Sequence, residues 1–245
     1  MEAIVIPLLD KTPAIDGDLG EWKLDAFSDG EWDMARVKAS PWYEPKRNRL
    51  VVDSNEVPGA ADLRAAYYLA WDGHHLYFGA EVHDNVNDVM DAKHEPKRWY
   101  YKDAIALFIE APRDGVAEKF EEGDHAFCFV MDNSKPDYGA WWRHGSATEA
   151  YIEEPIPTPS VDYALQMNPW GENPADYIFE GRIDVSSTLA LGMEKSKAFA
   201  ENEFSFMIVH CDPDGGEYGG HLLIYGKGDN DATWTRMKFE HAGQH

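Results

Sequence analysis

The chain has 245 residues and a formal net charge of −23, from 22 Lys and Arg against 45 Asp and Glu. This charge opposes binding to nucleic acid or to an anionic membrane surface, because both are themselves negatively charged. Hydrophobic residues make up 44% of the chain and aromatic residues 13%, which is enough to bury a core and excludes general disorder. We therefore expect one folded domain over residues 1–245.

The start of the chain carries no recognisable targeting signal. Residues 1–10 lack the basic start and the apolar run of a signal peptide. No stretch approaches the ~20 apolar residues of a membrane-spanning helix. These residues predict either a cytoplasmic protein or one whose signal peptide is missing from this sequence.

Alternation of apolar and polar residues predicts β-strands along most of the chain. The pattern is clearest at residues 75–83 and 103–110. In the second of these, Ile105, Leu107 and Ile109 are expected to point inward, and Ala104, Ala106 and Phe108 to lie on the other face. Further strands are expected at 64–71, 125–131, 138–143, 149–152, 161–166, 176–183, 203–211, 220–225 and 233–239.

Gly, Pro, Asn and Asp separate these segments, as in WDGHH and NPWGENP, where the chain must reverse. One helical segment is expected over 184–193. Many short strands joined by such turns favour an all-β fold of two packed antiparallel sheets over a βαβ fold. Two long irregular segments, 30–64 and 152–175, are expected to be insertions into this sandwich.

Familiar catalytic motifs are missing from the sequence. It has no GxSxG, HExxH, P-loop, GxGxxG or CxxCH pattern, so we expect a protein that is not an enzyme. Its two cysteines, Cys128 and Cys211, fall on expected strands, where they are interpreted as buried apolar residues. A disulfide between them remains the alternative.

The chain is rich in flat rings, with nine Trp and twelve Tyr. Such rings stack on the apolar face of a sugar, so an uncharged carbohydrate is a plausible ligand for an acidic protein. Trp99, Tyr100 and Tyr101 precede the strand at 103–110 and adjoin Lys102. Three successive rings cannot all face one core, so at least one, taken as Tyr100, is expected at the surface as a stacking platform; simple packing at the rim is the alternative.

Acidic residues cluster at three places: DGDLGEW at 16–22, HDNVNDVMD at 83–91 and DPDGGE at 212–217. Calcium takes six to eight oxygen ligands, and such loops supply them. None of the three has the spacing of an EF-hand, so each could equally be a solvated turn.

Six segments occur in an order that resembles carbohydrate-binding module family 9, a β-sandwich of the DOMON-like group. They are PAIDGDLGEW, AAYYLAWDGHHLYFGAEVHDN, DAIALFIE, GDHAFCFVMD, FEGRIDVSSTLAL and NEFSFMIVHCD, covering about residues 13 to 239 apart from the two insertions. The resemblance implies a jelly-roll-like antiparallel sandwich with structural calcium. It also implies an extracytoplasmic, periplasmic or secreted, domain that binds an oligosaccharide or polysaccharide without catalysis.

Members of this family hold a terminal sugar between two aromatic rings, with a Glu, an Arg and an Asn completing the site. The first ring lies three residues before Asp103, at Tyr100, and the second falls near Tyr225 or Trp234. Ala106 stands where the family has its Glu, and Phe129 stands near its Arg. The hydrogen bonds that these two polar residues make to sugar hydroxyls are therefore expected to be lost.

The resemblance and the residue pattern together give two sets of expected site residues. The ligand-binding set is Trp99, Tyr100, Tyr101, Lys102, Tyr225 and Trp234. The metal-binding set, around HDNVND, is Asp84, Asn85, Asp88 and Asp103.

Two other functions remain open. Some DOMON-like sandwiches bind haem b for electron transfer, and Met131, Met207 and His210 on expected strands are candidate ligands. Alternatively, the chain is an accessory subunit whose insertions contact a protein partner through Trp32, Trp42, Tyr43 and Trp170.

Overall fold

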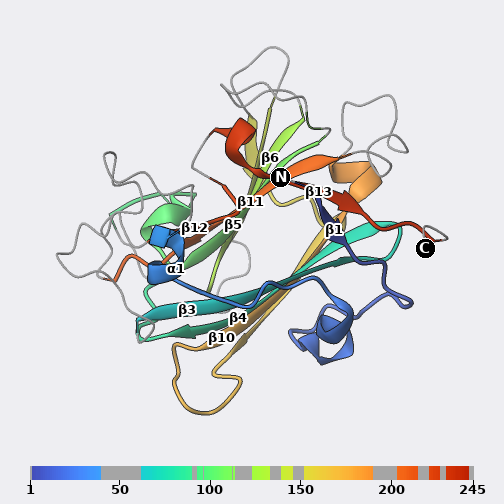
Figure 1. Cartoon of the computed structure of the whole chain (residues 1–245). Helices are drawn as coiled ribbons and strands as arrows, with labels where there is room; N and C mark the ends of the chain where they lie inside the picture. The colour runs from blue at the N-terminus through green and yellow to red at the C-terminus, as the bar shows by residue number, and fades with distance from the viewer. Residues whose placement is uncertain are drawn as a thin grey trace.

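A computed structural model shows two β-sheets packed face to face (Figure 1). It describes residues 2–39, 62–89, 93–95, 97–111, 113, 123–132, 139–145, 152–189, 203–214, 221–226 and 230–242. The expected all-β sandwich is confirmed.

The larger sheet has eight strands. Its order is β1 (Ile4–Ile6), β13 (Thr235–Phe239), β11 (Phe204–Cys211), β5 (Ala104–Glu110), β6 (Asp124–Val130), β7 (Ala140–His144) and β8 (Ile152–Pro155), with β12 (His221–Ile224) also paired to β11. All pairs are antiparallel except β1 with β13.

The smaller sheet has five antiparallel strands. Its order is β2 (Glu31–Asp33), β3 (Leu63–Trp71), β4 (His75–Asp84), β10 (Tyr177–Asp184) and β9 (Val161–Met167). The short helical elements are η1 (Leu19–Glu21), η2 (Lys23–Asp25), α1 (Met34–Ala39), η3 (Trp99–Tyr101), η5 (Val185–Leu189) and η6 (Asp231–Thr233).

Two expected segments are corrected by the structure. The segment 152–175 is not irregular throughout: β9 is the strand expected at 161–166, and β8 is a further paired strand within it. The helix expected over 184–193 is a single π-helical turn, η5, and residues 190–193 lie outside the described part. Of the insertion expected at 30–64, β2 and α1 are described, whereas 40–61 fall outside the described residues.

The core lies between the sheets. Ile105, Leu107 and Ile109 of β5 are fully buried there, on the face that their alternation predicted. A polar contact crosses this core: His210 of β11 is hydrogen-bonded through Nδ1 to the hydroxyl of Tyr67 at 2.7 Å and through Nε2 to the hydroxyl of Tyr177 at 2.6 Å. Because both tyrosines belong to the smaller sheet, this contact links the two layers.

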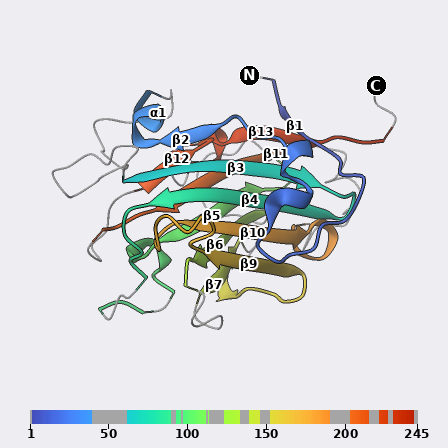
Figure 2. The same ribbon diagram turned by 90° about the horizontal axis from the view of Figure 1, so that it is seen from below.

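The N-terminal segment covers part of the outer face of the smaller sheet (Figure 2). Leu19 and Trp22 pack so closely over Gly79 that a Cβ there would lie 2.8 Å from Leu19 Cδ2. The segment is fixed by Glu180, whose carboxylate accepts the Trp22 indole N–H at 2.7 Å and the backbone N–H of Gly17 at 2.9 Å. The DGDLGEW motif therefore serves here to cover the sheet.

Candidate functional site

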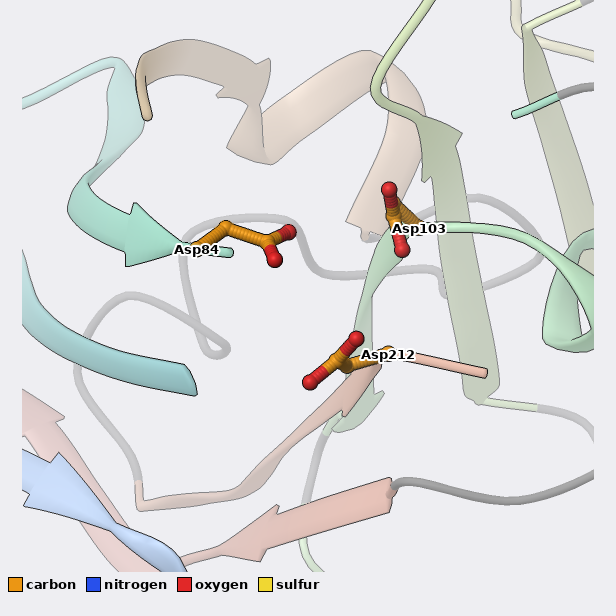
Figure 3. A group of neighbouring side chains, drawn as sticks. All are labelled: Asp84, Asp103 and Asp212. Atoms are coloured by element: carbon orange, nitrogen blue, oxygen red, sulfur yellow. The ribbon is translucent and has the colours of Figure 1, made fainter. Parts of the chain in front are cut away.

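Three aspartates meet at one end of the sandwich (Figure 3). Asp84 ends β4 in the smaller sheet, Asp103 directly precedes β5, and Asp212 directly follows β11 in the larger sheet. One carboxylate oxygen from each lies within 4.8 Å of the others, and all three side chains are buried.

Backbone hydrogen bonds hold two of these aspartates in place. Asp84 Oδ1 accepts the N–H of Val86 at 3.0 Å, and the N–H of Asp84 donates to Asp176 Oδ1 at 3.1 Å. Asp103 Oδ2 accepts the N–H of Asp88, whose carbonyl in turn accepts the N–H of Asp103 at 3.0 Å. In each of these two carboxylates, one oxygen accepts a backbone hydrogen bond, and the other oxygen accepts none.

The remaining oxygens have no donor within the part of the chain that the structure describes. These are Asp84 Oδ2, Asp103 Oδ1 and both carboxylate oxygens of Asp212. Burial, followed by repulsion from neighbouring carboxylates, raises the pKa of Asp212 to about 10. Burial raises the pKa of Asp84 to about 7 and raises that of Asp103 as well.

Buried ionised carboxylates without donors or counter-charge are strongly unfavourable, and either protonation or a bound cation removes this cost. Four oxygens from three carboxylates suit a hard divalent ion such as calcium. The donor set therefore fits the metal that the family resemblance implies.

The structure brings together two of the four residues expected to bind metal. Asp84 and Asp103 belong to the cluster, whereas Asn85 donates its side-chain amide to Asp62 Oδ1 at 2.5 Å. Asp88 contributes its backbone to hold Asp103. Asp212 was expected in a separate acidic cluster, and only the pairing of β11 with β5 brings it here.

The aromatic segment 99–101 forms η3, and its rings differ in exposure. Trp99 is buried against Phe108, with ring centroids 6.4 Å apart. Tyr100 and Tyr101 are half-buried, and their centroids lie 4.9 Å apart. Tyr101 also stacks on His94 at 3.6 Å. Two adjacent phenol rings are thus partly open to solvent.

Polar contacts hold this segment to its surroundings. Arg98 Nη1 donates to the hydroxyl of Tyr100 at 2.7 Å, and His221 Nε2 lies 3.5 Å from the carbonyl of Tyr100. Lys102 is only 8% exposed, so it does not present a free ammonium group at the surface.

Trp234 and Tyr225, the candidates for the second ring, are both buried and occupy different places. Trp234 packs on Phe108 at 5.6 Å, the same ring that Trp99 contacts. Tyr225 lies 5.5 Å from the ring of Trp32 and donates its hydroxyl to Asp29 Oδ1 at 2.8 Å. The hydroxyl of Tyr225 is thus already hydrogen-bonded within the fold.

The positions at which the family resemblance implies polar sugar-binding groups are apolar here. Ala106 pairs with Cys128 and Val209 in a buried row on the face of the larger sheet turned away from the smaller one. Phe129 points the other way, into the core, where its ring lies 4.9 Å from that of Phe179. No charged residue replaces the family Glu at this point in the strand.

The geometry opposes His210 and Met207 as a pair of haem ligands. Both ring nitrogens of His210 are already bonded to tyrosine hydroxyls, and burial lowers the pKa of His210 to about 3. Met207, three residues earlier on the same strand, points to the opposite face and packs against Gly226. These two residues cannot ligate one iron together.

Three further expectations have clear outcomes. Cys128 and Cys211 are buried free thiols, so the disulfide alternative is not observed. Trp32 is buried, Trp170 is exposed, and Trp42 and Tyr43 lie outside the described residues. Within the described ranges, no helix is both long and apolar enough to cross a membrane.

Comparisons with known proteins agree with this architecture. A family model described as "Carbohydrate family 9 binding domain-like" matches residues 29–236. No curated protein matches the sequence.

Solved structures show the same fold at low sequence identity. A family 9 carbohydrate-binding module from Caldicellulosiruptor kristjanssonii, solved with cellotriose, matches with a TM-score of 0.60 and 13% identity over 99% of this chain and 96% of that one. Its complex with glucose matches with a TM-score of 0.61 and 13% identity over 100% and 98%. A Bacteroides uniformis structure, titled a putative carbohydrate-binding protein, matches with a TM-score of 0.55 and 12% identity over 98% of both chains. Because the family model covers most of its length, the chain belongs to the carbohydrate family 9 binding domain-like family.

Proposed function

We propose that this protein is a non-catalytic carbohydrate-binding domain whose ligand stacks on Tyr100 and Tyr101. The observation that carries the proposal is the partial exposure of these two rings in η3, at the position where the family has its first sugar-binding ring. Family membership and the cellotriose and glucose complexes of a related module support a neutral sugar as ligand. The acidic charge of the chain disfavours polyanionic ligands.

Binding at this surface is expected to be weak. A stacked ring contributes about 0.5–1.5 kcal/mol beyond area burial, and ordering the sugar offsets part of this gain. Ala106 offers no acceptor to a sugar hydroxyl, and Lys102 is buried. Arg98, hydrogen-bonded to Tyr100, is a charged group placed beside this ring.

We further propose that Asp84, Asp103 and Asp212 bind calcium. The unpartnered carboxylate oxygens support this assignment, as does the burial of all three side chains. When bound, the ion supplies the positive charge that the cluster lacks. Asp103 lies two residues after Tyr101, so fixing its carboxylate also fixes the end of η3.

The proposed function places the protein outside the cytoplasm, in the periplasm or after secretion, where the resemblance implies that such binding domains act. Family membership supports the same assignment. The partner is then an oligosaccharide or polysaccharide, with no role for nucleic acid.

Binding to a glycan array and affinity electrophoresis in soluble neutral polysaccharides test the sugar proposal. We expect Tyr100→Ala to weaken binding about tenfold, with an unchanged melting temperature because the ring is half-exposed. Leu24→Ala, at a side chain 89% exposed on another part of the surface, is the control and should bind like wild type. Equal binding by wild type and Tyr100→Ala would refute the placement of the site.

A further inference from the structure

The outer face of the smaller sheet is only partly covered. The N-terminal segment packs over Tyr77, Gly79 and Ile178, but outward-facing residues nearer the other end of β3 and β4 stay half-exposed. A groove of about 510 Å³ lies there, within the size range of small-ligand sites. Its walls include Arg64, Tyr68, Glu81, His83, Trp170 and Glu172.

Aromatic rings form two sides of this groove. Trp170, in the turn between β9 and β10, is 37% exposed and stacks on His83 with centroids 4.3 Å apart and planes at 23°. Tyr68 of β3 also lines the groove and donates its hydroxyl to Glu81 at 2.7 Å. Both an exposed indole and a phenol can pack against the apolar face of a sugar ring.

The turn that carries Trp170 is held in one conformation by hydrogen bonds. The N–H of Asn168 donates to the carbonyl of Asp176 at 2.7 Å, and the N–H of Asp176 donates to the carbonyl of Asn173 at 3.1 Å. Asn173 Nδ2 donates to the carbonyl of Asp84 at 2.7 Å. The indole is therefore positioned before any ligand arrives, which lowers the entropy cost of binding.

The charges in the groove are mostly neutralised. Glu81 pairs with Lys23 at 2.5 Å, and Arg64 pairs with Glu31 at 3.1 Å. Glu172 is exposed, and no ion pair of its side chain is seen within the described residues. The groove thus offers hydrogen-bond acceptors and donors without excess positive charge, which favours hydroxyl groups over a carboxylate or a phosphate.

We infer that this groove is a second carbohydrate-binding site, one that takes a neutral oligosaccharide along Trp170 and Tyr68. The inference rests on the proposed function for its ligand class but not for its location. Trp99 packs on Phe108, which faces away from the smaller sheet, so η3 and the groove lie on opposite faces of the sandwich. One molecule could then bind two separate sugar chains.

Nitrogen-15 NMR of the tryptophan indole groups tests this inference with cellotriose as the probe. The Trp170 signal is assigned by its disappearance in Trp170→Phe. We expect it to shift saturably during titration, both in wild type and in Tyr100→Ala. Movement of other signals while that of Trp170 stays fixed would overturn the second site and leave the first intact.

A second measurement uses affinity electrophoresis in a soluble neutral polysaccharide. In the Tyr100→Ala background, where only the second site remains, Trp170→Ala should weaken the residual retardation about tenfold, and Trp170→Phe should retain part of it, because a smaller ring still stacks. Leu24→Ala again serves as control, and an unchanged melting temperature shows that the fold is intact. Binding only to a chitosan oligomer or to polygalacturonate would refute a neutral ligand, and failure of wild type to bind any sugar would refute both sites.

Discussion

Calcium should stabilise this protein through Asp212, and replacing that residue with Asn should abolish the effect. Asp212 has two buried carboxylate oxygens without donors, so it is the member of the cluster most dependent on a cation. A ligand present at about 100 times its Kd stabilises the folded state by about 2.7 kcal/mol. For a chain of this size, that corresponds to a rise in melting temperature of about 5–11 °C.

The raised pKa values determine how the stability of the protein, with and without calcium, should change with pH. In chelator, Asp84 and Asp212 have a raised pKa when folded, about 7 and about 10, so the folded state holds protons that the unfolded state has released. The resulting stabilisation is complete below about pH 4 and is lost as pH rises through the folded pKa values, by about 1.4 kcal/mol per pH unit for each proton. Calcium displaces these protons, so its effect should grow with pH.

Differential scanning calorimetry in calcium and in chelator, between about pH 5 and about pH 8, makes the measurement. Asp10→Asn removes one exposed carboxylate elsewhere and should keep the full calcium effect. The reasoning fails if calcium raises the melting temperature of Asp212→Asn as much as that of wild type. It also fails if the chelated protein becomes more stable as pH rises over this range.

Three substitutions test other parts of the fold by urea denaturation. Glu180→Gln should lower the free energy of unfolding by about 1.5–3 kcal/mol, because the charged acceptor that holds the N-terminal segment is lost. Tyr177→Phe should lower it by about 1–3 kcal/mol, because His210 Nε2 is left buried without its hydroxyl partner. Gly226→Ala should lower it by about 1–3 kcal/mol, because the new methyl group would lie 2.7 Å from Trp234 Cδ1. No measurable change in any one of them would contradict its stated contact.

Most of the strand positions were predictable because alternation and turn residues are local signals. The faces of the strand at 103–110 follow directly from them. The three-residue strands β1 and β2 are too short to show a period. Strand β8 was not predicted over 153–155 because proline argues against a strand, but Pro155 lies at the edge of the sheet, where a missing N–H is tolerated.

The site was less predictable, because it depends on contacts between distant segments. Asp212 joins Asp84 only through the packing of one sheet on the other, which no spacing in the sequence reveals. The burial of Tyr225 depends on Asp29, 196 positions away. The groove at Trp170 exists because the N-terminal segment covers one part of a sheet and leaves the rest open.

The aspartate cluster also joins the two layers, because Asp84 extends from one sheet while Asp103 and Asp212 extend from the other. Without a cation, rising pH ionises these carboxylates, and their mutual repulsion then weakens the contact between the layers at that edge, while the tyrosine–histidine contact still links the layers further in. Local opening should then begin at the metal-binding edge, and amide hydrogens near Asp84 and Cys211 should exchange faster than those at the opposite rim. A calcium ion bound by all three aspartates would hold the two sheets together at this edge.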